Sequence, residues 1–362
     1  MRTATAIEAS GGGTRRQQAD FVVEAGKLGP DVRRVAEAWG SDAPSALGYY
    51  AARPHRVLLG SGTMQAGTRT PVAVAQTAVT PSDLPGGRFL LGLGAPGPRV
   101  VEGPHGTPFA RPLARVRETV GIVRQVSGGG KVSYSGKEFE IPLPGGDAVP
   151  MRLSTRPEHD IPIYLATLSP AMLRLTGEIA DGWLGTSFVP EGAADAYFAH
   201  LDEGLARSGR SRADLDVCQG AEVAFAPDED ALRTMVANRK NELAFSLGGM
   251  GSASTNFYNR AYSRQGWAEV ADEVRQRWQA GDRDGATDLV TDEMVLSTTL
   301  IGTEPMVRER LRVWRNAGVD TVRLYPSGDT LDARLTTLAT AIGIVREIPT
   351  SSSANAERSA DG

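Results

Sequence analysis

The stretch RFLLGLG (residues 88–94) is a short apolar run that ends in glycines, and an amphipathic segment follows it at 110–127. The apolar residues of that segment recur three or four positions apart and so share one helix face: Leu113, Val116, Val120, Val123 and Val126. A β-forming run followed by such a helix is the βα unit of a parallel sheet. Comparable runs give eight expected strands, at 2–8, 33–38, 56–61, 88–93, 161–166, 182–187, 215–225 and 320–325. Eight strands with intervening helices predict a closed (β/α)8 TIM barrel.

The chain has 362 residues, which exceeds the roughly 250 of a typical barrel of this kind, so we expect insertions. One is expected after strand four, at 128–160, where alternating apolar residues around Ser135 and Gly136 predict a β-hairpin. The other is expected after strand seven, at 247–300, with a glycine-rich start and two helices. Both should overhang the end of the barrel where the strands finish. Residues 1–348 then form a single domain, and the small, polar tail at 349–362 is expected to be disordered.

The composition excludes several classes of partner. The chain has 39 basic and 43 acidic residues, a net charge of −4, so it offers no basic footprint for nucleic acid or an anionic membrane. It has neither an apolar stretch of the roughly 20 residues that cross a bilayer nor a signal-like start, which predicts a cytoplasmic protein. Cys218 is the single cysteine, and the four histidines lack i,i+4 spacing, so we expect no metal site.

The end of strand four contains Gly92-x-Gly94-x-x-Gly97, formally a dinucleotide fingerprint. A dinucleotide-binding loop must open directly into a helix, whereas prolines at 96, 98, 104 and 108 deny a helix there. The motif is therefore either a flexible strand-end turn or a glycine-lined rim that admits another cofactor. The rim interpretation is the stronger one.

Glu37, His105, Trp183 and the pair Ser169-Pro170 are further candidate site residues, and each has a purely structural alternative. Glu37 is a general base, an acceptor for a cofactor, or the partner of a nearby arginine. Ser169-Pro170 begins a helix, either only as its N-cap or also as a phosphate-binding site at the helix N-terminus, which we call the phosphate seat. His105, in the loop after strand four, is a proton donor or an idle surface residue. Trp183 either stacks on a ring or packs in the core.

Longer segments carry a family resemblance: AEAWGSDAP (36–44), LPGGRFLLGLG (84–94), GPRVVEGPHGTPFARPLARVRE (97–118), EIADGWL (178–184) and GGMGSASTNF (248–257). Together they resemble the bacterial luciferase-like monooxygenase superfamily, in particular its actinobacterial branch of oxidoreductases that use the deazaflavin coenzyme F-420. The resemblance runs from about residue 2 to 326. It implies a (β/α)8 barrel, a homodimer, and a flavin or deazaflavin held across the C-terminal end of the barrel.

The resemblance also implies site residues. A non-prolyl cis peptide would lie near Gly62-Thr63, and Glu37 would lie beside the ring of the cofactor. Gly94 and Ala95 would line the edge at strand four, and Gly182 with Trp183 would close the far side. The phosphate would be met by the run Thr167, Leu168, Ser169 and Pro170.

Some residues depart from the family pattern. Ala38 stands where some deazaflavin sugar dehydrogenases have histidine, and Gly97 replaces their second acidic residue, so the resemblance disfavours sugar oxidation. Ser169 replaces a glycine and suits the phosphate monoester of FMN at least as well. Arg34 stands at a strand position that is commonly apolar in relatives, and the sequence offers no physical account of it.

Three functions follow from these observations. The first is hydride transfer between reduced coenzyme F-420 and a small organic substrate, including one of secondary metabolism, with Glu37 and His105 as catalytic residues. The second is a monooxygenase that uses reduced FMN, O2 and a separate flavin reductase. The third is a barrel without cofactor that has a binding role.

Overall fold

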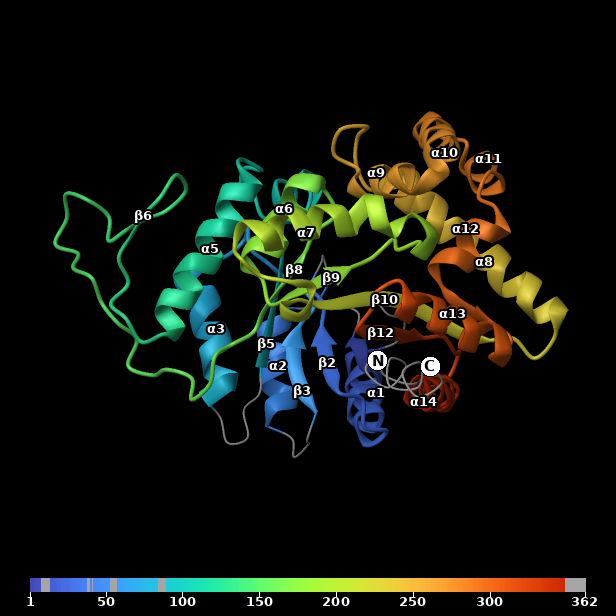
Figure 1. Cartoon of the computed structure of the whole chain (residues 1–362), viewed down its shortest axis with the longest axis horizontal. Coiled ribbons are helices and arrows are strands. Elements are labelled where there is room, and N and C mark those ends of the chain that lie inside the picture. Colours follow the sequence, from blue (N-terminus) through green and yellow to red (C-terminus); the bar gives the residue numbers. More distant parts are fainter. Residues whose placement is uncertain (8–13, 38–39, 41, 53–56, 84–88, 349–362) are drawn as a thin grey trace, which may run out of the picture.

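The computed structural model of the chain describes residues 1–7, 14–37, 40, 42–52, 57–83 and 89–348. Within them, parallel strands form a closed ring in which each strand is hydrogen-bonded to two neighbours (Figure 1). Around the ring these are β1 (Arg2–Ile7), β2 (Val32–Val35), β3 (Leu58–Ser61), β5 (Phe89–Gly94), β8 (Ile163–Ala166), β9 (Gly182–Gly185), β10 (Asp216–Phe225) and β12 (Thr321–Pro326). The ring closes at Thr321, which is opposite Arg2 of β1 and Cys218 of β10. The predicted barrel is confirmed.

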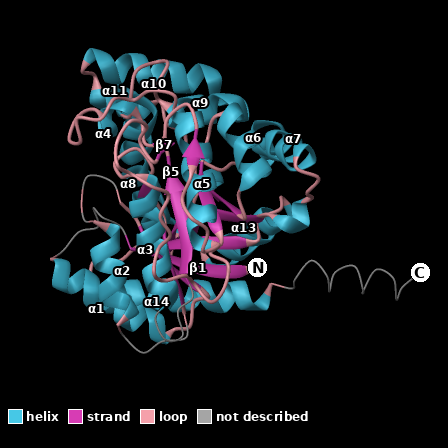
Figure 2. Ribbon diagram, turned by 90° about the vertical axis from the view of Figure 1, so that its left-hand side faces the viewer, coloured by secondary structure: helices cyan, strands magenta, loops and turns pink. Residues whose placement is uncertain are grey.

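Helices cover the outside of the ring (Figure 2). Those packed around the strands are α1 (Arg15–Lys27), α2 (Ala43–Ala51), α3 (Pro71–Asp83), α5 (Pro112–Ser127), α6 (Pro170–Ile179), α7 (Ala199–Arg207), α13 (Glu304–Asn316) and α14 (Leu331–Glu347). The apolar stripe expected at 110–127 faces the sheet, since Val116, Val120 and Val123 are all buried. Leu113 differs from the expectation because it lies in the first turn of α5 and is 39% exposed. The main core therefore lies between the strands and this helical layer.

The segment after the seventh barrel strand, which includes the expected insertion at 247–300, consists of helices joined by short loops and ends in a short strand. It contains α8 (Glu229–Gly249), α9 (Phe257–Tyr262), the π-helical turn η4 (Ser263–Trp267), α10 (Ala268–Ala280), α11 (Arg283–Asp288) and α12 (Asp292–Thr298), before β11 (Leu300–Gly302). These helices bury their own apolar cluster, which includes Leu247, Val274 and Met294. They lie above the C-terminal end of the barrel, as expected (Figure 1), although there are more of them than the two predicted.

The insertion at 128–160 forms the predicted hairpin, with β6 (Tyr134–Ser135) antiparallel to β7 (Glu140–Ile141). It follows helix α5 and not the strand itself. The buried carboxylate of Glu118 in α5 accepts hydrogen bonds from the backbone N–H groups of Lys137, Glu138 and Phe139 at 2.8–3.0 Å. The segment therefore packs along the outer side of α5 (Figure 1), and the prediction that it overhangs the end of the barrel is wrong.

Two short elements complete the C-terminal rim, by which we mean the end of the barrel where the strands finish: β4 (Met64–Gln65) and α4 (Pro98–Val101). The remaining turns are η1 (Pro190–Gly192), η2 (Ala194–Phe198) and η3 (Arg212–Asp214). No helix in the described ranges is long and apolar enough to span a bilayer. The expectations for Ala38 and for the tail at 349–362 fall outside the described residues.

Candidate active site

The ends of β3, β5 and β8 form a glycine-rich half of the C-terminal rim. The peptide bond between Gly62 and Thr63 is cis, as the family resemblance implied. Just before it, the hydroxyl of Ser61 donates to the carbonyl of Gly92 and accepts from its N–H, both at 2.8 Å. The side chain of Ser61 thus takes the place of backbone hydrogen bonds to Gly92 of β5. Backbone pairing with β5 continues in β4. Residues 61–63 therefore form a bulge at the rim.

The glycines of β5 make this bulge possible. A Cβ on Gly92 would lie 2.2 Å from the carbonyl oxygen of Ser61, and one on Gly94 would lie 2.9 Å from Oγ1 of Thr63. Gly92 is thus required by the close approach of the Ser61 backbone, whereas a side chain on Gly94 would displace the hydroxyl of Thr63. A short helix, α4, does begin at Pro98 despite the prolines, but it has only four residues. The motif is therefore a glycine-lined rim and not a dinucleotide-binding loop.

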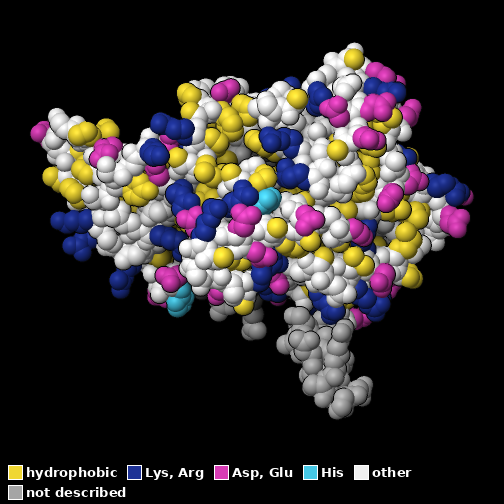
Figure 3. Space-filling model, turned by 45° about the horizontal axis from the view of Figure 1, so that its top comes forward, with side chains coloured by type: hydrophobic (Ala, Val, Ile, Leu, Met, Phe, Trp, Pro, Cys, Tyr) yellow, Lys and Arg dark blue, Asp and Glu magenta, His cyan; other side chains and the backbone are white. Residues whose placement is uncertain are grey.

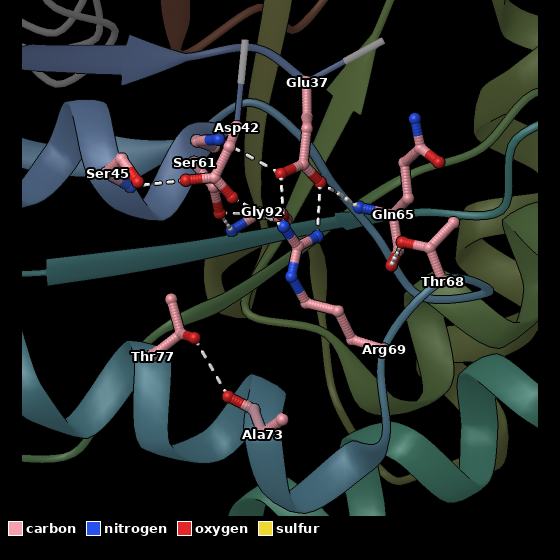
Figure 4. Close-up of polar contacts among 11 residues, drawn as sticks. Glu37, Asp42, Ser45, Ser61, Gln65, Thr68, Arg69, Ala73, Thr77 and Gly92 are labelled. Atoms are coloured by element: carbon pink, nitrogen blue, oxygen red, sulfur yellow. Dashed lines mark hydrogen bonds and ion pairs between the residues drawn. The ribbon is translucent and has the colours of Figure 1, made fainter. Parts of the chain in front are cut away.

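Glu37 follows β2 and is held by four donors (Figure 4). The two guanidinium Nη atoms of Arg69 donate to its carboxylate oxygens at 2.6 and 2.7 Å, and the backbone N–H groups of Ala43 and Gln65 donate at 3.0 and 3.1 Å. Its side chain is 8% exposed. The N–H of Glu37 also donates to the carbonyl of Thr63, which ties the residue to the bulge. Of the three roles considered for Glu37, pairing with an arginine is the one that the structure displays.

The start of α6 lies at the end of β8, beside the glycine-rich half. Ser169 is the N-cap and Pro170 follows in the first turn, but the hydroxyl of Ser169 makes no capping hydrogen bond. Arg264 of η4 donates from Nη2 to the carbonyl of Leu168 at 2.5 Å, and its Nε has no partner among the described residues. A helix N-terminus next to a guanidinium suits an anion such as a phosphate. Arg264 was not predicted, because it is 96 residues further along the chain than Leu168.

Other residues expected near this seat face elsewhere. Oγ1 of Thr167 is 2.8 Å from Oγ1 of Thr176 within α6, so the side chain does not face the rim. Trp183 is fully buried; its indole N–H donates to the carbonyl of Thr167 at 2.9 Å, and its ring packs against Tyr197. Gly182 begins β9, where a Cβ would collide with the ring of Tyr164 inside the barrel. Gly182 therefore faces the interior of the barrel, and Trp183 packs outside the strands and not over the end of the barrel, contrary to the prediction.

His105 lies in the loop after α4, and its side chain is exposed. Its backbone carbonyl accepts from Oγ1 of Thr107 at 3.4 Å. It neither lines the pocket described next nor contacts Glu37 in the described part of the chain. Its role as proton donor remains a prediction.

The other half of the rim carries a polar pocket of about 360 Å³. It lies over the ends of β1, β9, β10 and β12 and is covered by α8 and α9. Glu222, Arg239, Tyr258, Tyr262, Tyr325 and Ser327 are among its lining residues. Figure 3, which tilts this end of the molecule toward the viewer, shows Lys and Arg side chains around a hollow in this face.

Glu222 contacts two of the polar side chains that line the pocket. Its carboxylate accepts from Oγ of Ser327 at 2.6 Å and lies 3.3 Å from Nε of Arg239. Burial raises the pKa of the Tyr258 and Tyr262 hydroxyls, so both stay neutral donors near pH 7. These residues were missed from the sequence, although one signal was available. In the expected strand 215–225, Glu222 occupies the same inward-facing alternation as Cys218 and Gly220.

Backbone geometry also marks the pocket. Ser187, at the end of β9, has a φ of +54°, in the left-handed region that non-glycine residues rarely adopt. Its carbonyl accepts from the hydroxyl of Tyr197 at 2.9 Å and from Nε2 of Gln265 at 2.7 Å. Such conformations persist where the surroundings enforce them, often at functional sites.

The described residues contain no group of three or more His, Cys, Asp or Glu side chains arranged to hold a metal ion.

Comparisons with known proteins agree with this geometry. The chain matches the luciferase-like monooxygenase family over residues 2–321. It is 38% identical over 327 residues to a Mycobacterium tuberculosis protein assigned by name to the coenzyme F-420-dependent oxidoreductases, covering 88% of this chain and 93% of that protein. It is 31% identical over 278 residues to 5,10-methylenetetrahydromethanopterin reductase of Archaeoglobus fulgidus, covering 77% and 79%.

Among solved structures, the coenzyme F-420-dependent tetrahydromethanopterin reductase of Methanopyrus kandleri superposes with a TM-score of 0.74. The two chains are 22% identical, and the superposition covers 96% of this chain and 97% of the other, so the likeness concerns the fold. With a closed barrel and a family match over residues 2–321, the chain belongs to the luciferase-like monooxygenase family.

Proposed function

We propose that this protein is a coenzyme F-420-dependent oxidoreductase that transfers a hydride between the reduced cofactor and a small organic substrate. The names of its relatives, which include F-420-dependent oxidoreductases, support this assignment. The main structural support for this proposal is that the C-terminal rim has two different halves. A glycine-rich half with an anion seat lies beside a polar pocket of about 360 Å³, so a flat cofactor and a small polar molecule can meet over the barrel.

The residues present fit such a cofactor. The bulge at Gly62 and Thr63, together with Gly94 and Ala95, offers a rim edge with little side-chain bulk against which a flat ring can lie. Ser169 is an N-cap whose hydroxyl makes no capping bond, and Nε of Arg264 has no partner in the part of the chain that the structure describes; both suit the phosphate of the cofactor. When bound, coenzyme F-420 supplies the hydride from C5 of its ring.

The chain itself binds, orients and moves protons. Glu37, through Arg69, fixes the loop beside the bulge and thereby the edge of the ring site. In the polar pocket, Tyr258 and Glu222 can orient the substrate by hydrogen bonds. His105 or water would supply the proton. The homodimer implied by the resemblance belongs to this proposal as well.

A second candidate keeps the same site with a different cofactor. Ser169 can donate a hydrogen bond to a phosphate monoester, which favours FMN and a monooxygenase reaction with O2 and a separate flavin reductase. A deazaflavin lacks the N5 that helps to stabilise oxygen adducts, so the two candidates differ in their need for oxygen. The third candidate, a barrel without cofactor that has a binding role, stays open.

Anaerobic titration with both cofactors, followed by absorbance and fluorescence, tests the three candidates. Binding of coenzyme F-420, together with oxygen-independent oxidation of the reduced cofactor by a substrate, would support the proposal. Binding of FMN with product formation only in air would support the monooxygenase. Binding of neither cofactor would contradict both redox functions.

A further inference from the structure

Two arginines lie inside the barrel, where charged side chains are rarely found. Arg34 of β2 is 1% exposed and Arg323 of β12 is 6% exposed. Both belong to positions that alternate toward the interior of the ring, as Tyr164 and Cys218 do. Burying an ion costs several kcal/mol unless partners compensate it. Such residues therefore require an explanation, and Arg34 was already unusual in the sequence.

Arg34 lies directly under the bulge at the glycine-rich half of the rim. Its Nη1 donates to the carbonyl of Ser61 at 3.0 Å, the last carbonyl before Gly62. Its guanidinium lies 4.2 Å from the centre of the Tyr164 ring, and its Nε has no partner among the described residues. A Cβ on Gly62 would come within 2.8 Å of the Cβ of Arg34, so the bulge and the arginine are packed against each other.

The carboxylate that acts on Arg34, that of Asp216, already binds other groups. The ionisable groups that act on it are Cys218, Tyr164, Arg323 and Asp216. Burial raises the pKa of Cys218 and of Tyr164, so both are neutral, and Arg323 repels it. The carboxylate of Asp216 already receives Arg2 at 2.8 Å, the hydroxyl of Tyr164 at 2.8 Å and that of Thr321 at 3.0 Å.

Arginine stays protonated even when burial lowers its pKa, as it does here. The interior beneath the cofactor half therefore carries a positive charge that its protein neighbours compensate only in part. Arg323 lies under the other half of the rim. Its Nη2 is 3.4 Å from the carbonyl of Gly185, and its guanidinium lies next to Tyr325, which lines the polar pocket.

We propose that Arg34 is a positioning residue that holds the bulge through Ser61 and favours the anionic form of the cofactor ring bound above it. This inference rests on the proposed function, because it requires a ring at the glycine-rich half. Deazaflavin and flavin rings both carry acidic groups, and a fixed cation nearby stabilises their ionised forms. A charge below the ring also favours the reduced anion, the state that gives up a hydride.

The experiment measures the ionisation of the bound, oxidised cofactor by its absorbance between pH 4 and 10. Arg34→Met removes the charge and replaces it with an apolar chain, a change that buried sites often tolerate. Arg34→Gln also removes the charge but can still donate to Ser61, and Arg34→Lys keeps the charge. Arg323→Gln is the matched control under the other half. Circular dichroism and thermal unfolding establish that each variant is folded.

We expect the pKa of the bound ring to rise by about one unit or more in Arg34→Met and Arg34→Gln, which is the size of shift that one nearby charge produces. Arg34→Lys should stay close to the wild type, and Arg323→Gln should shift the pKa less. Folded, cofactor-binding Arg34→Met or Arg34→Gln with an unchanged ring pKa would overturn this inference and leave the proposed function intact. If the wild type binds neither coenzyme F-420 nor FMN, both proposals fall.

Discussion

Removing the carboxylate of Glu37 should destabilise the protein before it affects any chemistry. In the structure this carboxylate accepts two hydrogen bonds from Arg69 and one each from the N–H groups of Ala43 and Gln65. Glu37→Ala would leave two backbone donors without their acceptor and would strip Arg69 of its main partner. Arg69 would keep Asp42, whose carboxylate lies 2.9 Å away.

The magnitude follows from burial. Breaking a buried ion pair by removing one partner costs roughly 3–5 kcal/mol, and the lower end applies here because Arg69 is 22% exposed and retains Asp42. Unfolding entropy of about 2.1 cal/mol/K per residue over 362 residues gives roughly 0.76 kcal/mol/K. A loss of about 3 kcal/mol therefore lowers Tm by about 4 °C. Glu37→Gln, which keeps the size of the side chain and one acceptor oxygen, should cost about 1–2 kcal/mol.

Thermal and urea unfolding of the single variants and of a double-mutant cycle with Arg69→Met would measure these effects. A coupling free energy of about 1–3 kcal/mol between positions 37 and 69 is expected. The reasoning would be refuted if Glu37→Ala lowered Tm by less than about 1 °C and the coupling were near zero. If Glu37→Gln kept the stability of the wild type but lost turnover, Glu37 would be an acid–base group after all.

Three further predictions concern the phosphate seat, the core and the surface. Ser169→Asp should raise the Kd of the cofactor by about tenfold or more, because a carboxylate at the N-terminus of α6 repels phosphate, whereas Ser169→Ala should raise it by less than about threefold; equal values in a fluorescence titration would remove the seat from α6. Trp183→Phe should lower the free energy of unfolding by about 1–3 kcal/mol through the lost hydrogen bond to Thr167, with the Kd of the cofactor unchanged, and a selective loss of binding would restore Trp183 to the site. Hydrogen bonds from Arg117 hold the pKa of Glu178 below its usual range, so this depressed carboxyl adds stability above its unfolded pKa and loses it as the pH falls through the folded value. The free energy of unfolding of the wild type should accordingly exceed that of Glu178→Gln by about 0.5–1 kcal/mol at pH 7. A difference that persists at a pH where Glu178 is protonated in both the folded and the unfolded protein would contradict the ion pair.

The barrel could be predicted because its signal is local. Apolar runs such as FLLGLG fix a strand, and stripes such as that of α5 fix a helix, without reference to the rest of the chain. The short strands β4 and β11 were missed because two or three residues carry no periodicity and pair only because neighbouring strands are already in place. The hairpin at 128–160 was predicted, but its location was not, because Glu118 decides it through backbone contacts 19–21 residues away.

The candidate site was harder to predict because its contacts join distant segments. Glu37 meets Arg69, 32 residues away, and Leu168 meets Arg264, 96 residues away. The misplacement of Trp183 has a different cause. The start of β9 was predicted correctly, but Trp183 alternates outward between the inward-facing Gly182 and Leu184, so its ring packs against Tyr197 outside the strands and not over the barrel.

Arg34, which stands at a position that is commonly apolar in relatives, contacts the residues that shape the glycine-rich half of the rim. Its guanidinium binds the carbonyl of Ser61, and that carbonyl occupies the space that a side chain on Gly92 would fill. The bulge, Gly92 and the buried arginine are therefore packed against one another. A glycine-lined rim alone would accommodate a ring of any charge, whereas a rim built over a guanidinium discriminates between the ionisation states of the ring. For this reason the unexplained arginine belongs with the site and not with the core of the barrel.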